Sequence, residues 1–200
     1  SDYTVPSTSL VRGRRTEKAL RRHFTDIHIE ELPRQFRCVS TDLQSRTAYI
    51  HRDGDLTSAV MSSISIPGLF PPRRDGERLL VDGGVLDNLP VRALTERDEG
   101  PLIAVNIGMG GEARPRPAAD PDAPPAPTRV RIPALGETLM RSLFIGSGGA
   151  VVTARAAGAI VVTPSSMGVG LLEFHQLDRM VESGRQAGRA LLEQYGDELS

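Results

Sequence analysis

The residues best suited to chemistry in this sequence are Asp82, Gly83 and Gly84. They follow a short apolar run at residues 79–81, whose composition predicts a strand covered on both faces, as in parallel sheets. A carboxylate at the carboxyl end of such a strand lies where open α/β sheets hold their ligands. The two glycines permit a sharp turn and leave space beside the carboxylate. These residues therefore predict an acid–base site, although Asp-Gly-Gly alone is also typical of an ordinary turn.

Two segments before Asp82 are expected to position it. Residues 56–63 have apolar side chains at helical spacing and follow Asp55, which predicts a capped helix that ends before Pro67. Residues 36–43 and 47–52 alternate in the manner of two paired strands.

Further elements are expected along the rest of the chain. The predicted segments are a short helix at residues 16–24, a central strand at residues 102–107, one or two helices at residues 133–158, a buried strand at residues 159–163, and a last helix at residues 176–195 with one apolar face in the core. Residues 112–130 are rich in proline and alanine, which predicts a surface loop. Strands that alternate with helices predict an α/β sheet flanked by helices.

The motifs around Asp82 resemble those of the patatin-like phospholipases. They are Ser-Ile-Pro-Gly-Leu-Phe-Pro-Pro at residues 65–72, Leu-Val-Asp-Gly-Gly-Val at residues 80–85 and Asn-Leu-Pro-Val at residues 88–91. Residues 36–43 and 51–54 are similar to the neuropathy-target-esterase branch of that family and its bacterial relatives. The resemblance covers most of residues 1–110 and, more loosely, residues 135–195.

This resemblance implies a fold and an activity. The implied fold is a patatin-like three-layer α/β sandwich with a mostly parallel central sheet, of which residues 1–200 would be the C-terminal part, without the N-terminal part of the domain. The implied activity is hydrolysis of phospholipid or lysophospholipid esters by a serine–aspartate dyad. Asp82 would be the catalytic base of the dyad, and Gly83 and Gly84 would support its turn.

The nucleophilic serine of the family lies in a G-x-S-x-G elbow, and no serine of this chain has that setting. Ser147 has isoleucine at the leading glycine position, and Ser166 and Ser183 also lack the flanking glycines. We therefore expect the nucleophile and the oxyanion loop to be encoded before Ser1, and this chain alone to be inactive. Such a fragment is also expected to expose apolar surface, and to self-associate or pair with the missing segment.

The implied mechanism is acyl transfer. Asp82 would accept the serine proton as the hydroxyl attacks an ester carbonyl, and later a proton from the water that hydrolyses the acyl-enzyme. An aspartate of ordinary pKa is a weak base, whereas a dry site raises the pKa of a carboxyl group. The apolar Leu79, Leu80 and Phe70 are expected to supply such a site.

Two other functions remain open. One is a non-catalytic patatin-like module that binds lipid or a protein partner. The other is a hydrolase with a Ser-His-Asp triad that uses His175. The remaining histidines, His23, His28 and His51, lie in charged segments that predict exposed side chains.

Composition excludes several classes of function. A formal net charge of −1 argues against a nucleic-acid surface. The single cysteine, Cys38, excludes an internal disulfide, and the absence of a His/Cys cluster leaves no zinc framework, so no metal or cofactor is expected. No apolar run approaches the roughly twenty residues that a membrane span needs. A cytoplasmic or peripheral membrane location is therefore expected.

Arginines gather near the start of the chain, at Arg12, Arg14, Arg15, Arg21 and Arg22. The simpler interpretation of this cluster is a solvated helix face. The sharper interpretation is attraction to anionic lipid head groups, because each basic residue near such a surface adds a modest favourable contribution.

Overall fold

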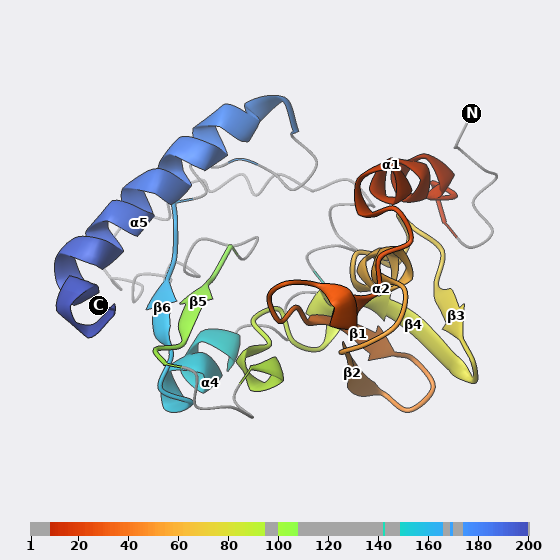
Figure 1. Cartoon of the computed structure of the whole chain (residues 1–200), viewed down its shortest axis with the longest axis horizontal. Helices are drawn as coiled ribbons and strands as arrows, with labels where there is room; N and C mark the ends of the chain where they lie inside the picture. The colour runs from red at the N-terminus through yellow and green to blue at the C-terminus, as the bar shows by residue number, and fades with distance from the viewer. Residues whose placement is uncertain are drawn as a thin grey trace, which may run out of the picture. The chain divides into compact units, whose positions relative to one another are not determined.

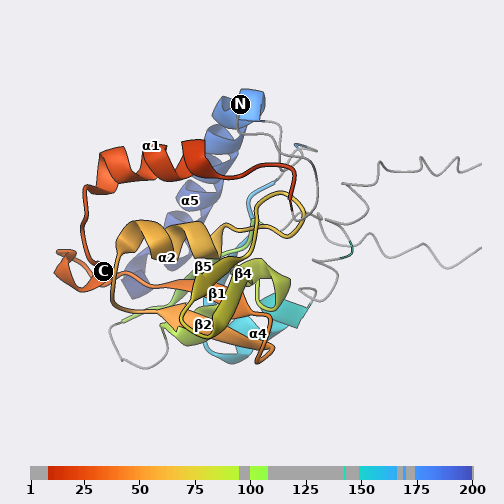
Figure 2. The same cartoon turned by 90° about the vertical axis from the view of Figure 1, so that its right-hand side faces the viewer.

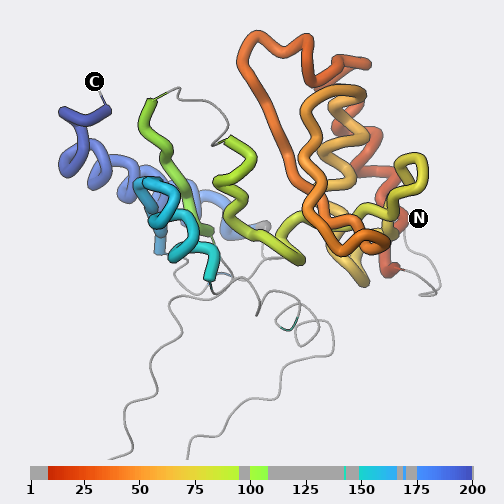
Figure 3. Tube along the Cα trace, turned by 90° about the horizontal axis from the view of Figure 1, so that it is seen from below, coloured from red at the N-terminus to blue at the C-terminus, as the bar shows by residue number. Residues whose placement is uncertain are grey.

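The computed structural model describes residues 9–94, 100–107, 142, 149–165, 169 and 174–199, and these residues are coloured in Figure 3. Its helices and strands, labelled in Figure 1, are α1 (Arg14–Phe24), β1 (Cys38–Asp42), β2 (Thr47–His51), α2 (Leu56–Ser63), β3 (Arg73–Asp75), β4 (Arg78–Asp82), β5 (Ile103–Val105), α4 (Ala150–Ala156), β6 (Ile160–Val162) and α5 (Leu177–Leu199). The chain divides into two compact units, which are described separately. The first holds residues 1–104 and 143–161, and the second holds residues 105–142 and 162–200.

A four-stranded sheet in the first unit ends at Asp82. Its strand order is β2-β1-β4-β3, so β1 and β4 are central. Leu80 and Val81 of β4 are fully buried, as their apolar character predicted. The predicted pairing of residues 36–43 with residues 47–52 is confirmed, because Cys38 to Asp42 pair with His51 to Thr47.

The prediction of a mostly parallel sheet is wrong for this sheet, because all three of its strand pairs are antiparallel. For the pairs β1–β2 and β3–β4 the reason lies in the connections. Residues 43–46 join β1 to β2, and Gly76 and Glu77 join β3 to β4. Such short links suit hairpins, whereas parallel strands need a crossover of about a dozen residues.

The helix α2 covers the sheet and is capped as predicted. The Asp55 carboxylate accepts a hydrogen bond from the Ser58 N–H at 2.8 Å. The apolar Leu56, Ala59 and Met61 of α2 are buried. The helix α1 packs outside α2, so that α1, α2 and the sheet form successive layers in Figure 2.

Changing Asp55 to alanine should destabilise the chain by about 1 kcal/mol, because the first turn of α2 loses its side-chain cap. Asp55 also meets the Arg21 guanidinium at 3.4 Å. The variant Asp55→Asn is the matched control, since asparagine caps equally well but carries no charge. Urea unfolding should show that Asp55→Asn lowers the free energy of unfolding less than Asp55→Ala does. Equal losses for the two variants would assign the effect to the ion pair instead of the cap.

The helix α1 begins at Arg14, two residues before the predicted Thr16, and Gly13 precedes it in the left-handed region with φ 77°. A Cβ built on Gly13 would lie 3.2 Å from the Phe70 ring and 3.3 Å from the Met61 methyl group. Glycine therefore lets the start of α1 approach the loop that follows α2.

A second, two-stranded sheet pairs β5 with β6. The Ile160 N–H donates to the Leu102 carbonyl, and the Asn106 N–H donates to the Val162 carbonyl. These bonds advance in the same direction along both strands, which is the parallel pattern. The predicted central position of residues 102–107 is wrong for the described residues, because β5 has β6 as its single partner in a two-stranded sheet. Ile103 and Val105 are also 40% and 51% exposed.

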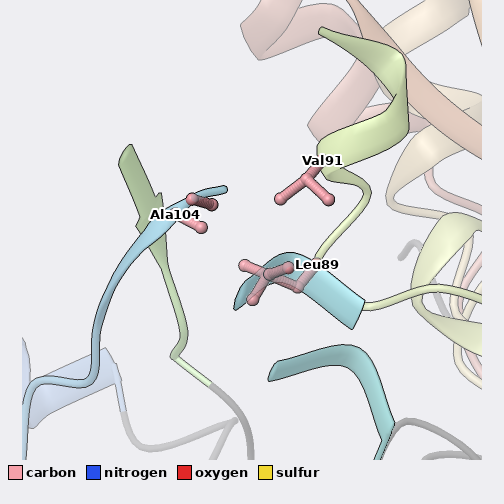
Figure 4. Packing of buried hydrophobic residues seen from close by; sticks show 5 residues of the cluster. Leu89, Val91 and Ala104 are labelled. Atoms are coloured by element: carbon pink, nitrogen blue, oxygen red, sulfur yellow. The ribbon is translucent and has the colours of Figure 1, made fainter. Parts of the chain in front are cut away.

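A small apolar cluster in the first unit joins the segment after Asp82 to β5 and α4. Its buried members are Leu89, Val91, Ala104, Ala154 and Ala159. Figure 4 shows Leu89 and Val91 turned toward Ala104. The Asn-Leu-Pro-Val motif therefore contributes core side chains.

The second unit contains α5, which is longer than the predicted residues 176–195. The predicted burial of its apolar face is wrong for the described residues, because Leu177 and Leu192 are 62% and 61% exposed and Ser183 alone is buried. The predicted loop at residues 112–130 and most of the predicted helical region at residues 133–148 lie outside the described residues. None of the helices in the described part of the chain combines the length and apolar character needed to cross a bilayer.

Candidate active site

The two motifs that flank Asp82 meet in space. Asp82 is the last residue of β4, and its N–H donates to the Ser65 carbonyl at 3.0 Å. Ser65 is buried, and its hydroxyl donates to the Met61 carbonyl at 2.6 Å. The end of α2 and the end of β4 are therefore held together at the predicted site.

The Asp82 carboxylate is half-buried and caps the turn that follows it. Its Oδ1 accepts a hydrogen bond from the Gly84 N–H at 2.7 Å. Burial raises the pKa of Asp82, and the Gly84 hydrogen bond partly opposes this rise by favouring the charged form. Asp82 is therefore a stronger base than an exposed aspartate.

Gly83 allows the turn to lie directly against β1. A Cβ built on Gly83 would lie 2.3 Å from the Val39 carbonyl oxygen and 2.8 Å from its carbon. Both distances are far inside van der Waals contact, so no other residue fits without a shift of the β1 backbone. Gly83 and Gly84 are both buried in the 3-10 turn of residues 83–85.

A buried Ser40–His51 pair lies beside Asp82. The Ser40 hydroxyl and His51 Nε2 are 2.8 Å apart, and both residues are buried. Ser40 is also the direct cross-strand partner of Asp82. Cross-strand partners lie on one face with β-carbons roughly 5 Å apart. The pair and the carboxylate therefore share one face of the sheet.

The prediction that His51 is exposed is wrong. His51 is 7% exposed, and its ring meets that of Tyr49 edge-on, with the centroids 4.7 Å apart. The charged neighbours Arg52 and Asp53 suggested exposure, but strand alternation places His51 on the covered face. In the predicted pairing of the two strands, His51 lies opposite Cys38 and Tyr49 lies opposite Ser40. This pairing was the signal that could have indicated that His51 is buried.

Residues 2–95 match the family model described as Patatin-like phospholipase. The chain belongs to the patatin-like phospholipase family. It is also 36% identical over 205 residues to an uncharacterized NTE family protein of Mycobacterium tuberculosis, covering 98% of this chain and 35% of that protein.

More distant patatin-like relatives carry a named activity. Lysophospholipase NTE1 of Candida glabrata is 29% identical over 208 residues, covering 99% of this chain and 12% of that protein. Lysophospholipase NTE1 of Saccharomyces cerevisiae is 27% identical over 203 residues, covering 96% of this chain and 12% of that protein. The patatin-like chain thus spans about a third of the length of its mycobacterial relative and much less of the fungal ones.

The other candidate residues in the sequence of this patatin-like chain are His175 and three serines. His175 is exposed and belongs to the second unit. Ser183 is buried and donates to the Ser165 carbonyl at 2.7 Å, whereas Ser147 and Ser166 lie outside the described residues. The described residues contain no group of three or more His, Cys, Asp or Glu that could hold a metal ion.

Burial of His51 should make stability depend on pH. Burial holds the pKa of His51 below its ordinary value of 6.5. The unfolded chain therefore takes up a proton first, so the stability that neutral His51 confers is present above about pH 6.5 and is lost as the pH falls toward the folded pKa. Urea unfolding from about pH 7.5 to about pH 5.5 should show this loss.

The variant His51→Gln is the control for this pH dependence. Glutamine can still hydrogen-bond to Ser40 but does not titrate. Its stability should change less over the same pH range. Parallel curves for the parent and the variant would contradict the assignment of the acid-sensitive step to His51.

Proposed function

We propose that this chain supplies the general base of a lipid esterase that hydrolyses phospholipid or lysophospholipid esters through a serine–aspartate dyad. Membership of the patatin-like family and the lysophospholipase relatives support a lipid hydrolase. The observation that carries the assignment to Asp82 is the setting of its carboxylate, which is half-buried at the end of β4 with a raised pKa. The Asp-Gly-Gly motif provides this setting.

The two carboxylate oxygens of Asp82 have different tasks in this proposal. Oδ1 is held by the Gly84 N–H, which fixes the orientation of the side chain. Oδ2 is then the oxygen that accepts the proton of the attacking serine. As that proton moves, the serine oxygen forms a bond to the ester carbonyl carbon, and the protonated Asp82 returns the proton to the departing alcohol.

The second half of the reaction reverses these roles. Asp82 removes a proton from water, the water oxygen attacks the acyl-enzyme carbonyl, and the proton returns to the serine as the fatty acid leaves. Burial of Asp82 helps in both halves, because a base whose pKa lies nearer the working pH binds the transferred proton more strongly.

The nucleophile is proposed to come from outside residues 1–200. The sequence contains no G-x-S-x-G segment. Two serines that contact Asp82 in the fold are also unsuited to attack a substrate, because Ser40 and Ser65 are both almost fully buried, and the Ser65 hydroxyl donates to the Met61 carbonyl. Residues 1–200 alone should therefore be inactive.

A comparison of two proteins tests this proposal. The full-length product of the gene should hydrolyse lysophosphatidylcholine and should be labelled by a fluorophosphonate, which reacts with activated serines. Residues 1–200 should show neither activity. Labelling of a serine within residues 1–200, or turnover by this chain alone, would refute an external nucleophile.

A further inference from the structure

The helix α1 has one face directed at the rest of its unit and one face directed at solvent. Successive residues of an α-helix are rotated by about 100°, so residues four apart lie nearly above one another. Glu17, Leu20 and Phe24 are partly buried, whereas Arg14, Lys18 and Arg22 are exposed. We call these last three residues the basic stripe. They follow one another at intervals of four along the outer face.

The ion pairs of α1 are formed by Glu17 and Arg21, which are not members of the basic stripe. Glu17 pairs with Arg73 at 3.1 Å and with Arg21 at 3.5 Å. Arg21 also meets Asp26 and Asp55. In the described part of the chain, no acidic residue forms an ion pair with a member of the basic stripe.

Arg22 lies in the last turn of α1, where a cation is favoured by the helix dipole, but Arg14 and Lys18 do not stabilise their own helix. Arg14 is at the first helical position, where the positive end of the helix dipole disfavours a cation. Arg14 and Lys18 are like charges at i,i+4, as are Lys18 and Arg22, and such pairs are unfavourable. Gly13 at the N-cap offers no side-chain hydrogen bond. The charges therefore need another explanation than local helix stability.

We propose that the basic stripe of α1 is a docking surface for the anionic face of a lipid bilayer. Lysine and arginine near such a surface each add a favourable electrostatic contribution, and clusters of them bind acidic lipids. The other exposed residues of α1 are Arg15, Ala19, Arg21 and His23, so the outer face carries no large apolar side chain. Binding should therefore be electrostatic and sensitive to salt, without insertion into the acyl chains.

The location of α1 agrees with this role. Within the first unit, α1 is the layer beyond α2, on the side away from the four-stranded sheet (Figure 2). The choice of a lipid surface over a nucleic acid rests on the proposed lipid hydrolase, whose substrates reside in lipid surfaces.

The test measures sedimentation of the 200-residue chain with vesicles, and it uses no catalytic readout. Vesicles are made of phosphatidylcholine alone or of phosphatidylcholine with phosphatidylserine. The parent should bind only the anionic vesicles, and high salt should release it. The variant Arg14→Gln/Lys18→Gln/Arg22→Gln should bind about ten- to a hundredfold more weakly. Failure of the esterase proposal would leave this result unchanged.

A second triple variant separates clustering from net charge. Arg34, Arg46 and Arg74 are exposed residues of the same unit outside α1, and Arg34→Gln/Arg46→Gln/Arg74→Gln loses the same charge. It should bind like the parent. Glutamine retains helix propensity, and circular dichroism should confirm that both variants fold. Equal losses in the two variants, or parent-like binding by the stripe variant, would overturn the proposal. Stripe-dependent binding to a DNA duplex with equal affinity would overturn its assignment to lipid.

Discussion

Changing Asp82 to asparagine should lower ester hydrolysis by the full-length product of the gene about a hundredfold to ten-thousandfold. That range is the usual contribution of a positioned general base. Asparagine has nearly the same shape, and its side-chain oxygen can still accept the Gly84 N–H that Oδ1 accepts at 2.7 Å. The loss should therefore appear in turnover, measured on lysophosphatidylcholine, without loss of the fold.

The stability of Asp82→Asn gives an independent check. Burial raises the pKa of Asp82 above its ordinary 3.8, so its contribution to stability is present at low pH and is lost as the pH rises through the folded pKa. At neutral pH the charged carboxylate is a cost that asparagine removes. The variant should then be at least as stable as the parent, and a large loss of stability would mean that misfolding explains the lost turnover.

Asp87→Asn is the matched control for the catalytic variant. Asp87 lies in the same segment, is also half-buried, and accepts the Leu89 N–H at 3.1 Å through its carboxylate. The substitution removes the same charge and keeps the same kind of hydrogen bond. It should retain most of the turnover. Equal loss in the two variants would assign the effect to charge in the segment as a whole.

Changing Gly83 to alanine should destabilise the chain by about 2–4 kcal/mol, with a fall in the melting temperature of roughly 10 °C. The added methyl carbon would lie 2.3 Å from the Val39 carbonyl oxygen. That oxygen belongs to the backbone of a central buried strand, so it cannot move aside as a flexible side chain would. Thermal unfolding of the 200-residue chain measures the effect.

Gly76→Ala is the control for a glycine that is needed only for its backbone conformation. Gly76 has φ 56°, and a Cβ built there meets nothing within 4 Å. Alanine at this left-handed position should cost about 1 kcal/mol. If Gly83→Ala cost no more than Gly76→Ala, then the β1 backbone would be able to yield and the turn would be less constrained than described.

The sequence predicted the local elements before Asp82 well. The cap at Asp55 and the pairing of the strands at residues 36–43 and 47–52 are confirmed, because each depends on neighbours in sequence. Asp82 also lies at the end of its strand, as the apolar run at residues 79–81 predicted. Local signals were sufficient for these features.

Features that depend on distant partners were not predictable in the same way. An apolar run such as Leu79-Leu80-Val81 predicts a buried strand, but burial does not distinguish a parallel from an antiparallel neighbour. The apolar spacing of α5 likewise predicts a packed face without showing what covers it, and in the described residues Leu177 and Leu192 are exposed. The apolar pattern of a segment therefore does not show which distant element packs against it.

Part of the candidate site was also missed. Asp82, Gly83 and Gly84 were predicted, whereas the Ser40–His51 pair beside them was not. The pairing of β1 with β2 brings Ser40 and His51 together. The pair lies beside the carboxylate only because Ser40 of β1 is the cross-strand partner of Asp82 in β4. That register involves residues separated by α2 and β3, so no short-range pattern encodes it.

The most direct test of Asp82 as the base is the pH dependence of serine acylation in the full-length product, measured in a single turnover with and without the Asp82→Asn change. The parent rate should fall on the acid side with an apparent pKa above the ordinary 3.8 of aspartate, because burial raises the pKa of Asp82. In the variant the rate should be low at every pH and this acid limb should be absent. A variant that keeps both the parent rate and the acid limb would show that another group removes the serine proton.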